Sequence, residues 1–275
     1  MKQKRINYLE DASGTGALAN ANIVDCEVNW YSSRTSYNMR PPINPGDRRF
    51  TVTVEGNIGC GKSTFLRYFE QLSTKNEILQ EPIYLWKDAR GHNLFELMYT
   101  DLTKWAVPFQ AQVLVTLLDR QLKPQKASVR LVERSIYSCR YCFVECMHDD
   151  GHITNGDYKS MDQIFSWAFQ KKAVPVDLIV YLRASPMVCY GRVRTRNRAG
   201  EDHIPLAYLQ QLHDKHEAWL LHGKFGPLPA PLIVFNCDHP LPQLIAQYRS
   251  RQTEVMCGVP LDEPRADVGV AEFRC

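Results

Sequence analysis

Five short apolar runs rich in β-branched residues recur along the chain, and longer segments with helical spacing separate them. The runs cover residues 51–54, 77–80, 129–135, 177–182 and 232–235. Runs of this length and composition are typical of buried strands. Strands that alternate with helices predict parallel βαβ units. The pattern therefore predicts a doubly wound α/β domain, a five-stranded parallel sheet flanked by helices.

Apolar positions three and four residues apart predict the helices between these strands. They cover residues 64–71, 108–121, 138–147, 161–172, 205–220 and 241–251. We expect Pro108 in the first turn of its helix, where a proline is tolerated. Gln110 shares the apolar stripe of that helix with Val113. A buried amide there needs a partner, either backbone or a ligand.

The ends of the chain lack this periodicity. Residues 1–48 are predicted to be a disordered leader, 49–252 the folded domain and 253–275 a flexible tail. The early basic residues Lys2, Lys4 and Arg5 fit the start of a mitochondrial transit peptide, whereas Glu10 and Asp11 argue against a strong one. No secretory apolar region follows. We expect an intracellular protein, mitochondrial or cytosolic and nuclear, and not a secreted one.

Charge and cysteine content narrow the class of partner. The chain has 33 basic and 30 acidic residues, so its charge demands neither nucleic acid nor a membrane surface. No apolar run reaches the ~18 residues of a membrane helix. The 9 cysteines are expected to be reduced, buried thiols. Cys139, Cys142 and Cys146 lack the paired spacing of a zinc site.

A glycine-rich loop after the first predicted strand matches the phosphate-loop pattern G-x-x-x-x-G-K-[ST] at every fixed position. It consists of Gly56, Asn57, Ile58, Gly59, Cys60, Gly61, Lys62 and Ser63, and Thr64 follows it. Glycines allow backbone N–H groups to surround phosphate oxygens, and the N-terminus of the next helix favours negative charge. The lysine supplies a charge for the outer phosphates, and the serine supplies a hydroxyl for Mg²⁺.

Two acids and a run of arginines are the other candidates for chemistry. Glu81 and Glu133 each come at the end of a predicted strand, where open α/β sheets bind ligands. No acid falls between Arg183 and Arg198, although arginines recur throughout this segment. Such a run is either a solvated helix face or a lid that closes on an anion. His213 and His216, with no third ligand nearby, are interpreted as core or surface residues.

Several motifs occur in the same order as in the deoxyribonucleoside kinases, and the chain resembles this family. Among its members, the resemblance is strongest to the mitochondrial thymidine kinase and the insect multisubstrate kinase. The resemblance covers about residues 50–250. Its motifs are the phosphate loop, Glu81-Pro82 with Trp86, 96–99, 108–110, 133–135, 140–145 and 192–201.

This resemblance implies a phosphate-loop kinase fold and the transfer of the γ-phosphate of ATP to the 5′-hydroxyl of a deoxyribonucleoside, with Mg²⁺. Glu81 resembles the base that accepts the hydroxyl proton, and Arg134 the arginine beside the reacting oxygens. Lys62 resembles the lysine on the phosphates. Ser63 and Glu133 resemble the residues near the metal. A homodimer is also implied.

The resemblance assigns the substrate contacts as well. Gln110 resembles the reader of the base and Phe143 the ring stacked on it. Tyr99 and Glu201 resemble the pair that holds the sugar 3′-hydroxyl in this family. Further pocket residues are Trp86, Met98, Phe109, Val113 and Cys139, and the lid that clamps the phosphates comprises Arg192, Arg196 and Arg198.

The chain departs from this family at two positions. Cys60 replaces the usual serine of the phosphate loop, and Cys139 stands where thymidine-preferring members have alanine and others aspartate. The lack of aspartate favours pyrimidines, thymidine and deoxycytidine. A thymidylate-type kinase is the alternative, because it shares the loop and the lid. A GTPase would need a D-x-x-G motif at the end of a strand and an N-K-x-D motif after the loop, and neither is found in this sequence.

Overall fold

The computed structural model describes residues 48–172, 174–198, 201 and 203–262. One sheet contains five parallel strands in the order β2-β3-β1-β4-β5. The strands are β1 (Phe50–Glu55), β2 (Asn76–Leu79), β3 (Val129–Glu133), β4 (Leu178–Arg183) and β5 (Leu232–Asn236). This sheet confirms the predicted α/β class.

The strand order brings separate parts of the sequence together at one edge of the sheet. β3 lies between β2 and β1, and Val54 of β1 is paired with Glu133 of β3. All five strands are parallel, so the segments that follow β1, β2 and β3 leave at the same edge. The phosphate loop, Glu81 and Arg134 follow these three strands directly.

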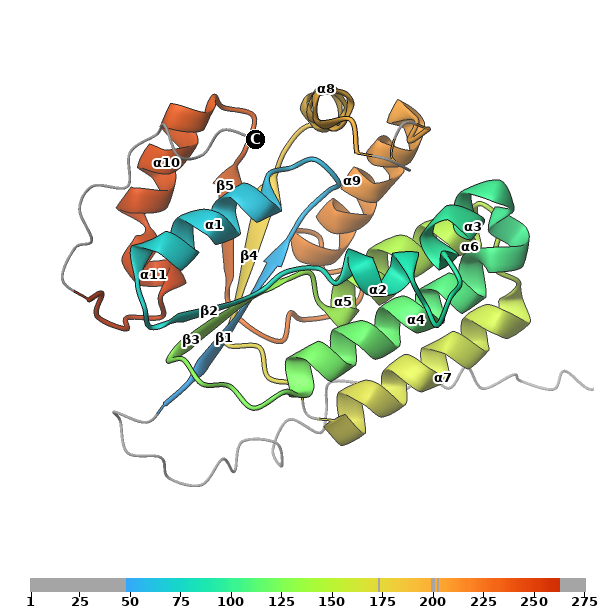
Figure 1. Ribbon diagram of the computed structural model, residues 1–275, viewed down its shortest axis with the longest axis horizontal. Coiled ribbons are helices and arrows are strands. Elements are labelled where there is room, and N and C mark those ends of the chain that lie inside the picture. The colour runs from blue at the N-terminus through green and yellow to red at the C-terminus, as the bar shows by residue number, and fades with distance from the viewer. Residues whose placement is uncertain (1–47, 173, 199–200, 202, 263–275) are drawn as a thin grey trace, which may run out of the picture. The chain divides into compact units, whose positions relative to one another are not determined.

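One face of the sheet is covered by α1 (Lys62–Leu72), α10 (Leu241–Ser250) and α11 (Gln252–Val255), as Figure 1 shows. Phe65 is central to this core, with ring centroids 4.7 Å from Phe69 and 4.9 Å from Tyr248. Such tilted and edge-on aromatic pairs stabilise a core beyond the area that they bury. They fix α1, and with it the phosphate loop, on the sheet.

The other face carries the remaining large helices, with a further group around the carboxyl edge (Figure 1). These helices are α2 (Ile83–Lys87), α3 (Leu94–Thr100), α4 (Leu102–Leu122), α5 (Ile136–Ser138), the π-helix η1 (Cys139–Val144), α6 (Glu145–Asp149), α7 (Asn155–Lys172), α8 (Pro186–Arg196) and α9 (Leu206–Leu220).

Three helices differ from their predicted form. α4 begins at Leu102, so Pro108 lies inside it and the first-turn prediction is wrong. The Asp101 carboxylate caps this helix by accepting from Lys104 N at 3.0 Å, which explains the earlier start. The single helix predicted over 138–147 is divided by the π-helical turn of η1. α7 begins at Asn155 and not at residue 161.

Residues 253–262, expected to belong to a flexible tail, pack against the domain instead. Val255 and Met256 are fully buried, and the Asp262 carboxylate accepts a hydrogen bond from Thr74 N at 2.9 Å. Cys257, Val259 and Leu261 pack against the same core, but the segment is too short and irregular to give a periodic pattern, so the sequence did not indicate this contact. Apart from Arg48, the predicted leader lies outside the described residues, as do residues 263–275.

Candidate active site

The phosphate loop joins β1 to α1, and its glycines have two different functions. A Cβ on Gly56 or Gly59 would lie 2.6 Å from the carbonyl oxygen of Leu182 or Cys189, so close backbone packing excludes side chains there. Gly61 has a φ of 108° and open space around its Cα. No side chain caps the N-terminus of α1. The first-turn amides are therefore available to an anion.

Lys62 and Ser63 place a cation and a hydroxyl at the mouth of this loop. Lys62 Nζ donates to the carbonyl oxygens of Asn57 at 2.8 Å and Gly56 at 3.2 Å. Ser63 Oγ donates to Glu133 Oε1 at 3.3 Å. A hydroxyl beside a carboxylate is the hard oxygen pair that Mg²⁺ prefers together with phosphate oxygens and water. The described residues contain no group of three or more His, Cys, Asp or Glu that could hold a metal.

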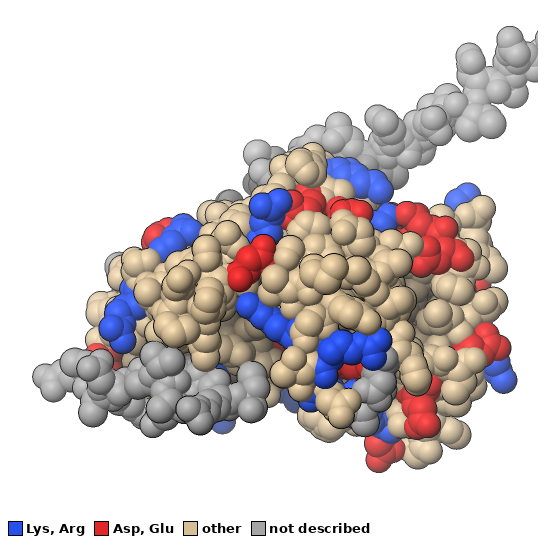
Figure 2. All heavy atoms as spheres, turned by 90° about the horizontal axis from the view of Figure 1, so that it is seen from above, with Lys and Arg blue, Asp and Glu red and all other residues tan. Residues whose placement is uncertain are grey.

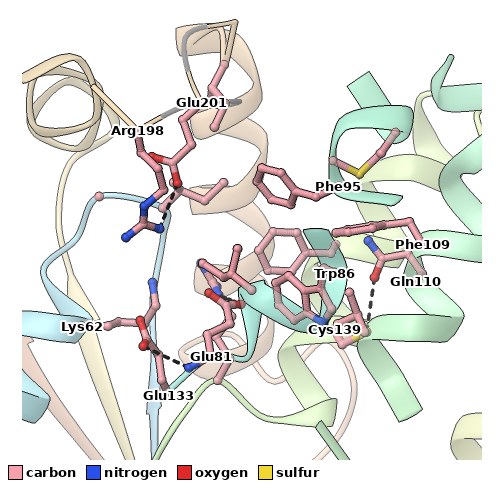
Figure 3. A pocket seen from close by; sticks show the side chains of 18 of the residues that line it. Lys62, Glu81, Trp86, Phe95, Phe109, Gln110, Glu133, Cys139, Arg198 and Glu201 are labelled. Carbon is pink, nitrogen blue, oxygen red and sulfur yellow. Dashed lines mark hydrogen bonds and ion pairs between the residues drawn. The ribbon is translucent and has the colours of Figure 1, made fainter. Parts of the chain in front are cut away.

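Glu81 and Arg134 form an ion pair beside the phosphate loop, with Arg134 Nε 3.0 Å from Glu81 Oε1 (Figure 3 shows Glu81). Arg134 also donates from Nη1 to the Gly56 carbonyl oxygen at 3.0 Å, and its guanidinium lies 4.6 Å from the Phe143 ring centroid. Burial alone would lower the pKa of Arg134, but the nearby carboxylates, Glu81 first, raise it. One guanidinium thus contacts the acid, the loop and an aromatic ring.

Arg120 supports this arrangement, and sequence reasoning missed it. From α4, it donates to the carbonyl oxygens of Leu79 at 3.0 Å, Glu133 at 2.8 Å and Arg134 at 3.1 Å. Burial lowers the pKa of Arg120 to about 10. These bonds hold the ends of β2 and β3 together, and so they fix the backbone on which Glu81 and Arg134 sit. A basic residue on a buried helix stripe was the available signal.

An apolar chamber opens beside these charged groups. The Trp86 and Phe109 rings pack edge to face with centroids 5.8 Å apart, and Phe95 lies 6.1 Å from Phe109 (Figure 3). Trp86 Nε1 donates to Thr116 Oγ1 at 2.9 Å, which satisfies its buried N–H. The walls therefore suit a flat, mostly apolar group.

Gln110 points into the chamber between two sulfur atoms. It is 1% exposed; Cys139 Sγ lies 3.3 Å from its Oε1, and Met147 Sδ lies 3.5 Å from its Nε2. The predicted buried amide thus has only weak sulfur partners, which leaves its remaining hydrogen-bonding capacity directed to a ligand.

Arg196 and Arg198 form the upper rim with Glu201, with nitrogen–oxygen distances of 2.6 and 3.3 Å (Figure 3 shows Arg198). Glu201 is 6% exposed. Burial, followed by the Glu201 charge, raises the pKa of Tyr99, so its hydroxyl remains a donor near this rim. Basic and acidic side chains are interspersed on the face seen in Figure 2.

Arg192 does not line this pocket. It donates to the carbonyl oxygens of Cys60 at 3.3 Å, Cys237 at 2.8 Å and His239 at 3.4 Å. Its guanidinium joins the phosphate loop to the segment after β5. The structure therefore separates Arg192 from Arg196 and Arg198, with which the sequence grouped it.

Most of the predicted catalytic and substrate residues line one pocket. They are Lys62, Ser63, Glu81, Trp86, Met98, Tyr99, Phe109, Gln110, Val113, Glu133, Arg134, Cys139, Phe143, Arg196, Arg198 and Glu201, together with Ile58 and Gly59 of the loop. Gly56, Asn57, Cys60, Gly61 and Thr64 lie outside its lining. The lining residues that the sequence did not indicate are Gln80, Ile83, Phe95, Leu117, Met147, Ile204 and Tyr208.

None of the helices in the described part of the chain is long and apolar enough to cross a membrane.

Residues 52–255 match the family model described as deoxynucleoside kinase. Mitochondrial thymidine kinase 2 of Homo sapiens is 40% identical over 210 residues, which cover 76% of this chain and 79% of that protein. Deoxycytidine kinase 2 of Gallus gallus is 34% identical over 193 residues, 62% of this chain and 73% of that one. Deoxycytidine kinase of Homo sapiens is 31% identical over 201 residues, 64% and 77% of the two chains.

Proposed function

The chain belongs to the deoxynucleoside kinase family, and from that premise we propose that it phosphorylates the 5′-hydroxyl of deoxyribonucleosides with ATP. The observation that carries this proposal is the ion pair of Glu81 and Arg134, which lies between the phosphate loop and an apolar chamber. An acid in this position reaches an acceptor hydroxyl, and the loop beside it suits a donor phosphate.

The side chains divide the chemistry among them. Glu81 accepts the proton of the acceptor hydroxyl as general base. Arg134 stabilises the negative charge that develops on the transferring oxygens, held by its bond to the Gly56 carbonyl oxygen. Ser63 and Glu133 would hold Mg²⁺, which, when bound, offsets charge on the phosphates. The amides of the loop and Lys62 bind the phosphates of ATP.

The chamber suits the nucleoside. Phe143 offers a ring face for the base, and Gln110 offers a donor and an acceptor for the base edge. Tyr99 and Glu201 at the rim suit a sugar hydroxyl, and Arg196 with Arg198 closes over the phosphates. Cys139 lacks a carboxylate that could pair with a purine, so we propose that thymidine and deoxycytidine are preferred.

A thymidylate-type kinase is the competing function, and it would need a further basic group for the phosphate of its acceptor. The described lining has four cations, and each already has a partner. Lys62 bonds to loop carbonyls, Arg134 pairs with Glu81, and Arg196 and Arg198 share Glu201. This arrangement favours a nucleoside over a nucleotide as acceptor.

A coupled assay of ADP release tests the choice, with thymidine or thymidylate as acceptor and a blank without acceptor. We expect release with thymidine that is well above both other reactions. Release that is faster with thymidylate would support the competing kinase. Release that is equal in all three reactions would indicate an ATPase and contradict both.

We further propose that two copies associate through α4 and α7, which contact each other. Val115 of α4 is 61% exposed, and Ile164 and Trp167 of α7 are 48% and 49% exposed. Exposed apolar residues on adjacent helices suit a second copy of the same surface. Sedimentation should show a dimer that Ile164→Arg weakens. Met187→Arg should leave the dimer unchanged, because Met187 is an exposed residue of α8 and lies on neither α4 nor α7. Sedimentation of the wild type as a monomer contradicts the proposal.

The relatives from Homo sapiens and Macaca fascicularis are named as mitochondrial. We propose that this chain acts inside the cell, in mitochondria or in the cytosol and nucleus. Fractionation of cells that express the full chain with a C-terminal tag distinguishes these compartments. Accumulation of the tagged protein in the medium would contradict the proposal.

A further inference from the structure

The two sulfur atoms beside Gln110 differ in hydrogen-bonding character. The Cys139 thiol donates to Gln110 Oε1 at 3.3 Å, the contact marked by a dashed line in Figure 3. Met147 Sδ accepts from Gln110 Nε2 at 3.5 Å. Gln110 is 1% exposed, Cys139 is 2% exposed and Met147 is 4% exposed, so water does not compete for these contacts.

These neighbours make the two orientations of the amide unequal. A thioether only accepts hydrogen bonds, so Met147 favours the amide nitrogen over the amide oxygen. Burial raises the pKa of the Cys139 thiol, so the group stays protonated and can donate. Half a turn of the amide would place two acceptors, Gln110 Oε1 and Met147 Sδ, against each other. Both sulfur contacts therefore favour the same orientation.

The orientation matters because pyrimidines differ along the edge that an amide reads. Cytosine has an amino donor beside the N3 acceptor, whereas thymine and uracil have the O4 acceptor beside an N3–H donor. One amide in one place pairs with these edges only in opposite orientations. We propose that Cys139, supported by Met147, fixes the Gln110 amide and thereby sets the preference between 4-amino and 4-oxo pyrimidine nucleosides. This inference rests on the proposed function.

Deoxyuridine and deoxycytidine provide the test, because neither has a 5-methyl group and they differ in the 4-position and N3 pattern. In Cys139→Ala, the ratio of their kcat/KM values should move about two- to tenfold from the wild-type ratio, as loss of one weak hydrogen bond allows. In Cys139→Ser, the ratio should move the opposite way, because a hydroxyl is the stronger donor. Met147→Leu should move it in the same direction as Cys139→Ala.

Two controls separate orientation from volume. The ratio of thymidine to deoxyuridine reports the space around the 5-methyl group and not the amide. Cys142→Ala removes another fully buried thiol of η1, one that packs in the core with Ile179 and Tyr181, outside the pocket lining. This variant should keep the wild-type ratio of deoxyuridine to deoxycytidine.

The outcomes distinguish this inference from the proposed function. A constant deoxyuridine-to-deoxycytidine ratio in all Cys139 variants, or a shift in the same direction for alanine and serine, overturns the inference. The same ratio measured as nucleoside affinity by calorimetry tests it without turnover. Affinities that shift as expected in a protein that phosphorylates no nucleoside would contradict only the proposed function.

Discussion

Arg134 Nε lies 3.0 Å from Glu81 Oε1, and the two residues follow neighbouring strands of the sheet. Arg134 has a φ of 60°, which an ordinary side chain rarely adopts. Arg120 donates a hydrogen bond to the carbonyl oxygen of Arg134, and the Arg134 guanidinium donates to the carbonyl oxygen of Gly56. This positive φ at a residue held from both sides indicates a position built for chemistry.

Glu81→Gln should keep nucleoside binding but lose turnover by about 10² to 10⁴-fold, the usual contribution of a general base. The amide keeps the shape of the side chain but cannot accept the hydroxyl proton. Steady-state kinetics gives the turnover, and calorimetry with thymidine gives the affinity.

The matched control is Glu77→Gln. Glu77 lies on β2 and pairs with Arg130 at 3.3 Å, outside the pocket lining. This variant should keep its turnover. If Glu81→Gln retained more than about a third of wild-type turnover, the role of Glu81 as base would be wrong, because that loss is far below the range for a general base.

Arg196→Ala and Arg198→Ala should each reduce kcat more than they weaken nucleoside affinity. Both side chains line the pocket, and charge on a transferring phosphoryl group develops only during the reaction. A loss of about 10- to 10³-fold in kcat is expected for such a contact. Stopped-flow or steady-state kinetics at saturating thymidine measures it.

Arg194→Ala provides the comparison on the same helix. Its guanidinium lies 5.0 Å from the Tyr190 ring centroid, and it is absent from the pocket lining. We expect turnover close to wild type. Unchanged turnover in the Arg196 and Arg198 double variant would instead make this arginine run a solvated helix face.

The positions of the strands could be predicted because each strand is marked by its own short run of apolar residues. The β-branched apolar run 51–54 is buried along its whole length, and the run 232–235 is buried at alternate positions. Acids that follow such strands, as Glu81 follows β2, lie at the carboxyl edge of a parallel sheet. The phosphate loop was equally clear, since its glycines are required by packing against the carbonyl oxygens of Leu182 and Cys189.

The partners of long side chains could not be predicted in the same way. Arg192, Arg194 and Arg196 look alike in the sequence. Arg192 donates to the carbonyl oxygens of Cys60 and Cys237, Arg194 lies over the Tyr190 ring, and Arg196 pairs with Glu201. The difference depends on what lies opposite each position of α8. The sulfur of Met147 near Gln110 depends similarly on the π-helical turn, which shifts the facing of residues after Cys139 and leaves no clear sequence signal.

Arg192→Ala should lower the thermal stability, in contrast to the variants at the rim of the pocket. It would leave the carbonyl oxygens of Cys60, Cys237 and His239 without this donor, at a cost of about 1 kcal/mol or more for these partly buried acceptors. Calorimetry of Arg192→Ala beside Arg194→Ala measures the difference. Equal melting temperatures would show that the tether contributes nothing to stability.

His216 makes the stability of the fold depend on pH. The ring is fully buried, and it lies parallel to the Tyr181 ring with centroids 6.1 Å apart. Its Nδ1 is 2.6 Å from the Leu212 carbonyl oxygen. Burial, together with the charge of Arg134, lowers the pKa of His216 to about 3.

The unfolded chain takes up a proton on this residue below its ordinary pKa of about 6.5, whereas the folded chain does not. The contribution of His216 to stability is therefore complete above that pH, and it is lost progressively as the pH falls from 6.5 toward 3. Between pH 7.5 and 5, one such group removes about 2 kcal/mol from the free energy of unfolding.

His216→Phe keeps an aromatic ring against Tyr181 but does not titrate. Between pH 7.5 and 5, the free energy of unfolding of this variant should therefore fall by about 2 kcal/mol less than that of the wild type. The reason is that its unfolded state has no imidazole at position 216 to take up a proton. Urea unfolding of both proteins at pH 7.5 and 5 measures this difference. Measurements at pH 7.5 and 8.5 provide the control, because the free energies of unfolding of the two proteins should change in parallel there. Parallel curves at the acidic pair of pH values as well would show that His216 is protonated in the folded domain, contrary to its burial.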